Sequence, residues 1–230
     1  MSAKKLKLVV RDTGSIKDAV LPKSSGGRLL EQGLRDKLAE RYPDVEVEVV
    51  AEPSSGFQAL RSELESGGSS LIGSSTDVVL LSVADEVERF ADGQDPHAVA
   101  AAIKEDLLAC IKLIKSEVGA HILVANLSSI DPQNPIYTYH GLDAEPFTLC
   151  AQRLNLVLIG ASHEEGISII DVDRKIAEAG GGGTVVRGGV YNEAGSNVVL
   201  NELIRVLDDY GFLDDRPLME QIGAKTRGTT

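Results

Sequence analysis

The sequence predicts one α/β domain with a three-layer αβα architecture: a flavodoxin-like, doubly wound, five-stranded parallel sheet covered by helices. Five short runs of consecutive Val, Ile and Leu alternate with longer amphipathic segments. Consecutive apolar residues are typical of parallel strands, which are buried on both faces. A chain of 230 residues is long enough for one well-buried core, and nothing in it requires a second domain. Five such units imply right-handed βαβ crossovers.

The first three βα units fill the amino-terminal half of the chain. In each unit a short apolar run leads into a longer amphipathic segment, and in the third segment the apolar residues recur at three- and four-residue steps, as one face of a helix requires. Asp95 and Pro96 mark the start of the third helix, because proline suits the first helical turn. These elements are strand Leu6–Val10, helix Gly26–Arg41, strand Val45–Val50, helix Phe57–Ser66, strand Asp77–Val83 and helix Ala98–Glu117.

The last two units and a tail complete the chain. The four-glycine run at 180–183 precedes the last helix, and we interpret it as a hinge within a loop. Residues 1–209 are assigned to the domain and 210–230 to a C-terminal tail, which could pack across the domain or against a partner. The predicted elements are strand His121–Ala125, helix Pro146–His163, strand Ile167–Asp171 and helix Glu193–Asp209.

Composition and charge limit the classes of partner. The formal net charge of −12 repels nucleic acid and anionic membranes. No run of 18 apolar residues could cross a bilayer, and the basic N-terminus passes directly into a strand, unlike a signal peptide. Cys110 and Cys150 lie in helical patterns and are expected to be reduced, buried thiols. We therefore expect a cytoplasmic protein whose partner is a small molecule and not nucleic acid or a membrane. A homo-oligomer is compatible with the sequence.

The site should lie outside the carboxyl ends of the strands, where doubly wound folds bind ligands. Five loops share this edge, and the topology brings Asp12, Thr13 and Asp85 together next to strands 1 and 3. The carboxylates of Asp12 and Asp85 could bind an amine or a hydroxyl group of a ligand. Their mutual repulsion could also make their two pKa values differ. Equally, Asp12 could cap a helix and Asp85 could hold its loop through backbone hydrogen bonds. The loops are 11–25, 51–56, 84–97, 126–145 and 172–192.

Histidines are the natural general bases, and the chain has four. His121 and His163 belong to the opposite edge of the sheet. His97 stands directly before a helix, where a capping or solvent-exposed role is favoured. His140 follows Tyr139 in a loop of about twenty residues, a length typical of lids and binding loops, so contact with a ligand is favoured over catalysis.

Four segments resemble the SGNH (GDSL-type) hydrolases, and the resemblance covers residues 5–207. Arg11–Ser15 stands where that family has Gly-Asp-Ser with its nucleophile. Ser54–Gly56 fits the place of a glycine whose N–H helps form the oxyanion hole. Ser82–Asp85 takes the place of Gly-x-Asn-Asp, whose asparagine donates to the oxyanion. Arg187–Gly195 takes the place of Asp-x-x-His and the turn after it, and Asn192 within it begins the best-matching part. The resemblance implies the fold and a hydrolase ancestry.

The departures from the family pattern bear on function. Val190 stands where the family has its histidine base, and Arg187 stands where the family has the aspartate that orients this base. Ala84 stands in place of the asparagine that donates to the oxyanion. The nucleophile position is Thr13, a hydroxyl that is weak without a nearby base. Loss of one oxyanion donor alone typically lowers the rate by about 10²–10³. The sequence therefore argues against ordinary ester hydrolysis in this family's manner.

The sequence predicts a retained pocket that binds a small ligand, or that supports non-hydrolytic chemistry assisted by Asp12, Asp85 or His140. Arg187 would favour an anionic ligand if it points into the pocket, or would be a surface arginine paired with an acid. One alternative is an active esterase or acyltransferase in which Thr13 or Ser15 is activated by a relocated base such as His140. Another is a non-catalytic interaction protein that docks through its basic first helix or its tail.

No cofactor is expected, since no phosphate-binding fingerprint follows a strand, and no metal, since no His, Asp or Glu group has ligand spacing. The candidate catalytic residues are Asp12, Thr13, Ser15, Asp85 and His140. The candidate ligand-binding residues are Gly56, Ser82, Tyr139, Arg187 and Asn192.

Overall fold

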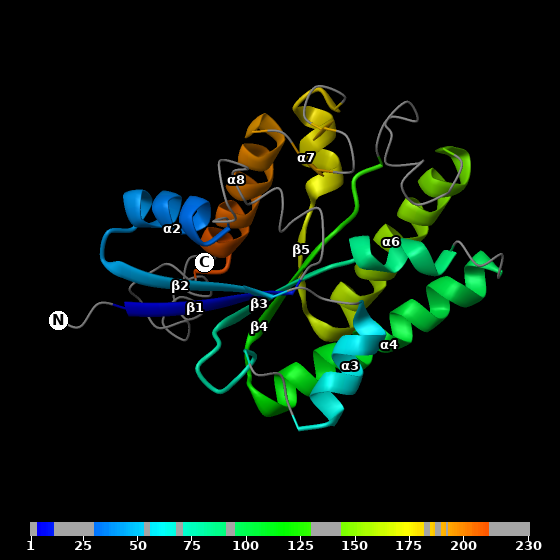
Figure 1. Cartoon of the computed structure of the whole chain (residues 1–230), viewed down its shortest axis with the longest axis horizontal. Coiled ribbons are helices and arrows are strands. Elements are labelled where there is room, and N and C mark those ends of the chain that lie inside the picture. The colour runs from blue at the N-terminus through cyan, green and yellow to red at the C-terminus, as the bar shows by residue number, and fades with distance from the viewer. Residues whose placement is uncertain are drawn as a thin grey trace, which may run out of the picture.

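The computed structural model has a five-stranded parallel sheet between two layers of helices (Figure 1). The strand order is β2-β1-β3-β4-β5, so the chain winds outward from the centre in both directions. This confirms the predicted fold class. The structure describes residues 4–11, 30–52, 56–67, 71–90, 95–129, 144–181, 185–186, 190–191 and 193–211.

The strands are buried on both faces because their apolar residues are consecutive. Within β3, Val78 and Leu80 join the core on one side of the sheet, whereas Val79 and Leu81 join the core on the other. Burial of each such side chain stabilises the fold by about 1.5–3 kcal/mol. The strands are β1 (Lys4–Arg11), β2 (Val45–Glu52), β3 (Val78–Ser82), β4 (His121–Ala125) and β5 (Ser168–Ile170).

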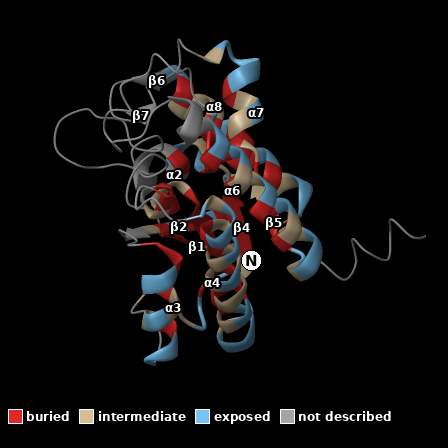
Figure 2. Cartoon of the chain, turned by 90° about the vertical axis from the view of Figure 1, so that its right-hand side faces the viewer, coloured by how far each residue is buried: buried red, intermediate tan, exposed pale blue. Residues whose placement is uncertain are grey.

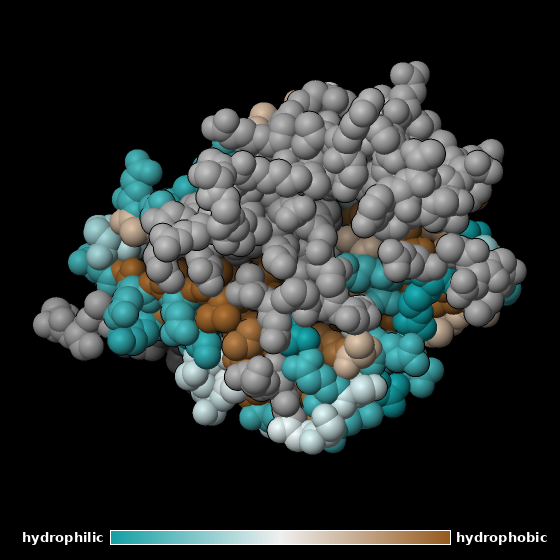
Figure 3. All heavy atoms as spheres, in the orientation of Figure 1, coloured by the Kyte–Doolittle hydropathy of each residue, from teal (hydrophilic) through white to brown (hydrophobic). Residues whose placement is uncertain are grey.

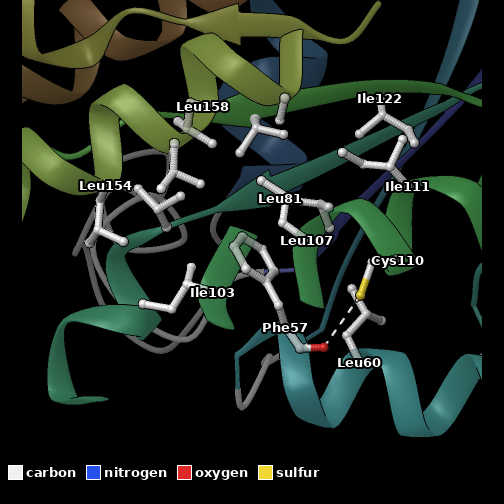
Figure 4. Close-up of a cluster of buried hydrophobic side chains, with 14 of the residues drawn as sticks. Phe57, Leu60, Leu81, Ile103, Leu107, Cys110, Ile111, Ile122, Leu154 and Leu158 are labelled. Atoms are coloured by element: carbon white, nitrogen blue, oxygen red, sulfur yellow. Dashed lines mark hydrogen bonds between the residues drawn. The ribbon is translucent and has the colours of Figure 1, made fainter. Parts of the chain in front are cut away.

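Helices α3 (Phe57–Glu65), α4 (Pro96–Glu117) and α6 (Ala144–Glu165) cover one face of the sheet (Figure 1). Their buried side chains meet those of β3 and β4 in the larger core (Figure 4). The inward stripe of α4 has the predicted three- and four-residue spacing, and the Asp95 side chain accepts a hydrogen bond from the His97 N–H at 3.1 Å. The start of α4 is thus capped as its sequence predicts.

Helices α2 (Leu30–Arg41), α7 (Val172–Glu178) and α8 (Glu193–Asp209) cover the opposite face. Leu34 and Leu38 of α2 pack with the β2 residues Val45, Val47 and Val49 in the second core. In Figure 2, buried residues line the inner sides of the helices and exposed residues their outer sides. This pattern is expected of amphipathic helices around a sheet.

Four short elements lie in segments that the sequence analysis assigned to loops. The 3₁₀ helix η1 (Ala84–Phe90) follows β3, and helix α7 follows β5. Strands β6 (Val185–Val186) and β7 (Val190–Tyr191) pair antiparallel in a separate two-stranded sheet. Each element is too short for its apolar periodicity to be recognised, and α7 depends on its Asp171 cap, whose side chain accepts from the Arg174 N–H at 3.3 Å. The prediction of one continuous loop over 172–192 was therefore wrong.

The face shown in Figure 3 mixes teal hydrophilic residues with brown hydrophobic ones where described residues reach the surface. Among the helices that the structure describes, none combines the length and the hydrophobicity needed to span a bilayer.

His121 lies at the amino end of β4, on the edge opposite the predicted site. Its Nε2 is 2.8 Å from Ser168 Oγ, and its ring centroid is 4.9 Å from that of Tyr210. Burial, and then the charge of Lys115, lower the pKa of the imidazole below its ordinary value. The folded state therefore prefers the neutral ring.

This preference predicts a specific loss of stability in acid. As pH falls through the unfolded-state pKa of histidine, about 6.5, the unfolded chain takes up a proton that folded His121 resists. The free energy of unfolding should therefore fall more steeply between neutral pH and pH 5 in the wild type than in His121→Gln. Denaturant unfolding across that range measures both slopes, and equal slopes would contradict the account.

Candidate functional site

The candidate site lies at the carboxyl edge of the sheet, next to the point where β1 has β2 on one side and β3 on the other. Ligands in doubly wound folds bind at such switch points. Arg11 ends β1, Gly56 precedes α3, and η1 follows β3. The side chains described at this edge are bound mainly to one another.

Arg11 ties the end of β1 to α3. Its side chain is only 6% exposed, and its guanidinium donates from Nη1 to Glu63 Oε1 at 3.2 Å and from Nη2 to Glu63 Oε2 at 2.6 Å. Two parallel charge-assisted hydrogen bonds of this kind fix both distance and orientation. The ion pair thus holds the last residue before Asp12 against the helix that begins after Gly56.

Glu86 of η1 caps the start of α3. Its carboxylate is buried, and Oε1 accepts a hydrogen bond from the Phe57 N–H at 2.5 Å. Phe57 is the first residue of α3, where the unpaired N–H groups and the helix dipole favour a negative charge. The first turn of α3 therefore already holds an internal anion.

Gly56 allows this close approach. Its φ of +86° and ψ of 175° lie in a region that only glycine readily adopts, and a Cβ built on it would lie 2.7 Å from Glu86 Oε1. Both the backbone conformation and the neighbouring carboxylate therefore require glycine here.

Glu86 is part of an ion-pair network that also includes Arg89 of η1 and residues of α3 and α4. Arg89 Nη1 donates to Glu86 Oε2 at 2.9 Å and to Asp106 Oδ2 at 3.0 Å, and Arg61 Nη1 lies 3.5 Å from Asp106 Oδ1. Burial lowers the pKa of Arg89, but its hydrogen bonds to Glu86 and Asp106 outweigh burial and the net shift is upward. Arg89 thus stays charged and offsets part of the negative charge of Glu86.

Cys110 of α4 is buried next to the first turn of α3, where its thiol donates to the Phe57 carbonyl at 3.3 Å (Figure 4). Burial, and then the carboxylates of Asp106 and Glu86, raise the pKa of the thiol to about 12. The thiolate is the reactive form of cysteine, so Cys110 is an inert core residue at neutral pH.

The ends of β4 and β5 are joined by hydrogen bonds that the side chains of Asn126, Asp171 and Asp173 make. Asn126 Nδ2 donates to Asp171 Oδ1 at 2.8 Å, and Asn126 Oδ1 accepts from the Asp173 N–H at 3.0 Å. Asp173 Oδ1 also accepts from the N–H of Ser129 at 2.6 Å and from its hydroxyl at 2.8 Å. These bonds hold the start of α7 against the segment after β4.

Comparison with known proteins identifies the fold. No family model matches the chain, and no curated protein matches it in sequence. Among solved structures, the chain is similar to an acetyl xylan esterase, with 13% identity over 88% of this chain and all (100%) of that one, and a TM-score of 0.61. The chain has the SGNH-hydrolase fold.

Two further structures support this assignment. A lipolytic protein of the G-D-S-L family from Veillonella parvula has 14% identity over 89% of this chain and 98% of its own, with a TM-score of 0.59. Phospholipase A1 from Streptomyces albidoflavus has 15% identity over 88% of this chain and 99% of its own, with a TM-score of 0.55. At these identities the likeness extends to the fold alone.

Three of the predicted site residues fall within the described part of the SGNH fold. Gly56 precedes α3 as the resemblance implies, but the neighbouring Phe57 N–H binds Glu86. Ser82 Oγ accepts from the Ala84 N–H at 3.1 Å and closes the turn after β3. Asp85 lies half-buried in the first turn of η1.

The other predicted residues lie outside the described residues, so their roles stay predictions. The backbone of Val190, which the resemblance predicts to stand at the base position, belongs to β7 and pairs with Val186. The residues outside are Asp12, Thr13, Ser15, Tyr139, His140, Arg187 and Asn192.

The sequence analysis missed the residues that organise this edge: Arg11, Glu63, Glu86, Arg89 and Asp106. The i,i+3 spacing of Glu86 and Arg89 signals an ion pair on a helix. However, Asp85, Glu86, Glu88 and Arg89 follow one another closely, and the sequence does not show which carboxylate is buried.

Proposed function

We propose that this SGNH-fold protein binds a small ligand at the carboxyl edge of its sheet and does not hydrolyse esters by the serine-hydrolase route. The observation that carries the proposal is the buried carboxylate of Glu86 at the N-terminus of α3, beside Gly56. In the family pattern this glycine turn contributes to the oxyanion hole. A fixed anion next to that turn opposes the charge that acyl transfer develops.

Like charges repel each other more strongly in a partly buried site than in water, so the Glu86 carboxylate beside this turn disfavours a second negative charge there. Arg89 offsets part of this repulsion, but its Nη1 is shared with Asp106. An oxyanion hole normally stabilises the developing negative charge with hydrogen-bond donors. Ala84 has no side-chain donor that could supply such a hydrogen bond.

The substituted residues of the family motifs support the same proposal. Val190 cannot accept a proton, so a hydroxyl at Thr13 lacks the base that family members use. Arg187 adds a cation close to that position in sequence, which favours an anionic ligand such as a carboxylate. The pocket would then be retained for binding, or for chemistry that forms no acyl-enzyme.

A second candidate function is ester hydrolysis or acyl transfer with Thr13 or Ser15 as the nucleophile and a relocated base such as His140. The names of the fold neighbours favour it, since they are described as an acetyl xylan esterase, a lipolytic protein and a phospholipase.

Hydrolysis of p-nitrophenyl acetate separates the two functions. We expect the wild type, Thr13→Ala and Ser15→Ala to show the same slow background rate, because no general base activates either hydroxyl. Saturable hydrolysis that disappears in Thr13→Ala or Ser15→Ala would contradict the proposal and support the second candidate.

Ligand binding has its own readout. Small carboxylates tested by thermal shift should raise the melting temperature of the wild type, and Arg187→Ala should lose that rise. A shift that is the same in both proteins would remove Arg187 from the binding account.

A further inference from the structure

Strand β2 forms one edge of the five-stranded sheet, and its outer side pairs with none of the described strands (Figure 1). It is paired with β1 on its inner side over its whole length, Val45–Glu52. An edge of eight residues is long, and its outward N–H and C=O groups can pair with a further strand.

The side chains of β2 define which strand fits beside it. Val45, Val47 and Val49 are buried with residues of α2 in the second core, whereas Glu46 and Glu48 are exposed on the other face of the sheet. A matching strand should therefore alternate small or apolar residues with cations, because side chains at neighbouring positions of adjacent strands lie on the same face.

Strand β1 provides such a match on the inner side of β2. Lys5 and Lys7 lie in register with Glu46 and Glu48, and Lys5 Nζ is 3.2 Å from Glu46 Oε2. Two cations separated by one residue thus fit the two carboxylates of β2, and the outer side of the strand offers the same two carboxylates to a second neighbour.

The same spacing recurs in residues 224–230, which lie outside the described residues. There Lys225 and Arg227 alternate with the small residues Ala224, Thr226 and Gly228. Threonine is among the residues favoured in strands. The segment therefore has the alternation that the outer edge of β2 requires.

The described chain also ends close to this edge. Asp208, in the last turn of α8, accepts a hydrogen bond from the Tyr42 hydroxyl, and its Oδ2 lies 2.7 Å from Arg41 Nη2. Tyr42 precedes β2 by three positions, so the chain reaches Gly211 near the start of β2. Residues 212–223 can span up to about 40 Å, which is ample to reach the outer side of the strand.

The topology of the sheet gives the direction of the next strand. Crossovers between parallel strands are right-handed. The crossover from β1 through α2 moves toward the β2 edge, and α8 covers the same face of the sheet as α2. A parallel strand after α8 therefore belongs on the β2 side of β5. Described strands fill every place from β5 to β2, so the place left for it is the outer edge of β2.

We propose that residues 224–230 add to the outer edge of β2 as a sixth parallel strand, with Lys225 beside Glu46 and Arg227 beside Glu48. The added strand pairs the outward backbone groups of β2 and places each carboxylate between two cations. This contact does not depend on the proposed ligand site or on its chemistry.

Cross-linking within the full-length chain tests the register. Val50 and Thr229 lie side by side in it, and Val50→Cys with Thr229→Cys leaves both cations in place. A short bismaleimide added to dilute protein should join positions 50 and 229 of one chain, which peptide mass spectrometry detects. In the matched control, Glu105→Cys at an exposed position of α4 replaces Val50→Cys and should give no such link. The native Cys110 and Cys150 are buried and stay unchanged.

Charge reversal tests what the edge recognises. Lys225→Glu with Arg227→Glu, added to the cysteine pair, should slow the cross-link about tenfold, because it sets like charges beside Glu46 and Glu48. Arg216→Glu changes the charge of the same tail outside the segment and should leave the rate unchanged. Hydrogen exchange gives a second readout: without the added cysteines, the charge-reversed chain should exchange its β2 amides faster than the wild type.

Three results would each overturn the proposal. The first is a 50–229 link no more abundant than the 105–229 link of the control. The second is a link that joins two different chains, because the occupant of the edge would then be another copy. The third is a cross-linking rate and a β2 exchange rate that charge reversal leaves unchanged.

Discussion

Replacing Glu86 with alanine is expected to lower the free energy of unfolding by about 1–3 kcal/mol, the cost of leaving a buried donor without its acceptor. The change leaves the Phe57 N–H without its acceptor and leaves Arg89 with Asp106 as its remaining carboxylate among the contacts described. It also opens space beside a close-packed core. Urea unfolding followed by circular dichroism gives the measurement.

Two further variants separate the causes. Glu86→Gln keeps the size of the side chain and an oxygen that can accept from Phe57, so its loss should be clearly smaller than that of Glu86→Ala. Glu65→Gln removes an exposed carboxylate that pairs with Arg61 on the surface of α3, and it should change stability little. If Glu86→Ala were no more costly than Glu65→Gln, Glu86 would not hold the start of α3.

Gly56→Ala is expected to destabilise the fold by about 3 kcal/mol. A side chain at this φ and ψ is strained by about 1–3 kcal/mol, and the added Cβ also meets the Glu86 carboxylate. Because that carboxylate is held by Phe57 and Arg89, it cannot move away without losing a hydrogen bond. The same unfolding experiment measures the loss.

The glycines elsewhere in the chain provide controls. Gly67 has φ of +121° with nothing within 4 Å of a built Cβ, so Gly67→Ala reports backbone strain without a clash. Gly73 has open space and no positive φ, so Gly73→Ala should be nearly neutral. Losses that follow the order Gly56, Gly67, Gly73 support the account, and an equal loss at Gly56 and Gly67 would show that contact with Glu86 contributes nothing.

The fold could be predicted because its signal is local. Parallel strands buried on both faces need consecutive apolar residues, and the run at residues 78–81 meets this need without reference to the rest of the chain. The α4 helix likewise shows its buried stripe and its cap in the sequence.

The candidate site was less predictable because its contacts join distant segments. Arg11 and Glu63 are 52 positions apart, and Glu86 reaches Phe57 across 29 positions. No periodicity shows that these charged residues are buried, and exposed solvated positions are the usual expectation for such residues. Sequence reasoning could identify Gly56 through its motif, but not the carboxylate that stands beside it.

The contacts at the carboxyl edge of the sheet and the residues that replace the family's motif residues point to the same proposal. In a serine hydrolase, the turn at Gly56 and the segment after β3 should present donors to a developing anion. Here the buried carboxylate of Glu86 stands beside that turn, where it accepts from the Phe57 N–H, and Ala84 offers no side-chain donor. The same segments remain well packed and tied to β1 through Arg11 and Glu63. This arrangement supports the proposal that the edge serves for binding and not for serine-hydrolase chemistry.

Intact-mass spectrometry after treatment with a fluorophosphonate tests the central claim most directly. This reagent traps a hydroxyl nucleophile only where a base activates it and the site can hold the resulting oxyanion-like adduct. We predict that the mass of the protein stays unchanged under conditions in which a working serine esterase is fully labelled. Complete, single labelling at Thr13 or Ser15 would contradict the account and show that the hydrolytic machinery is intact.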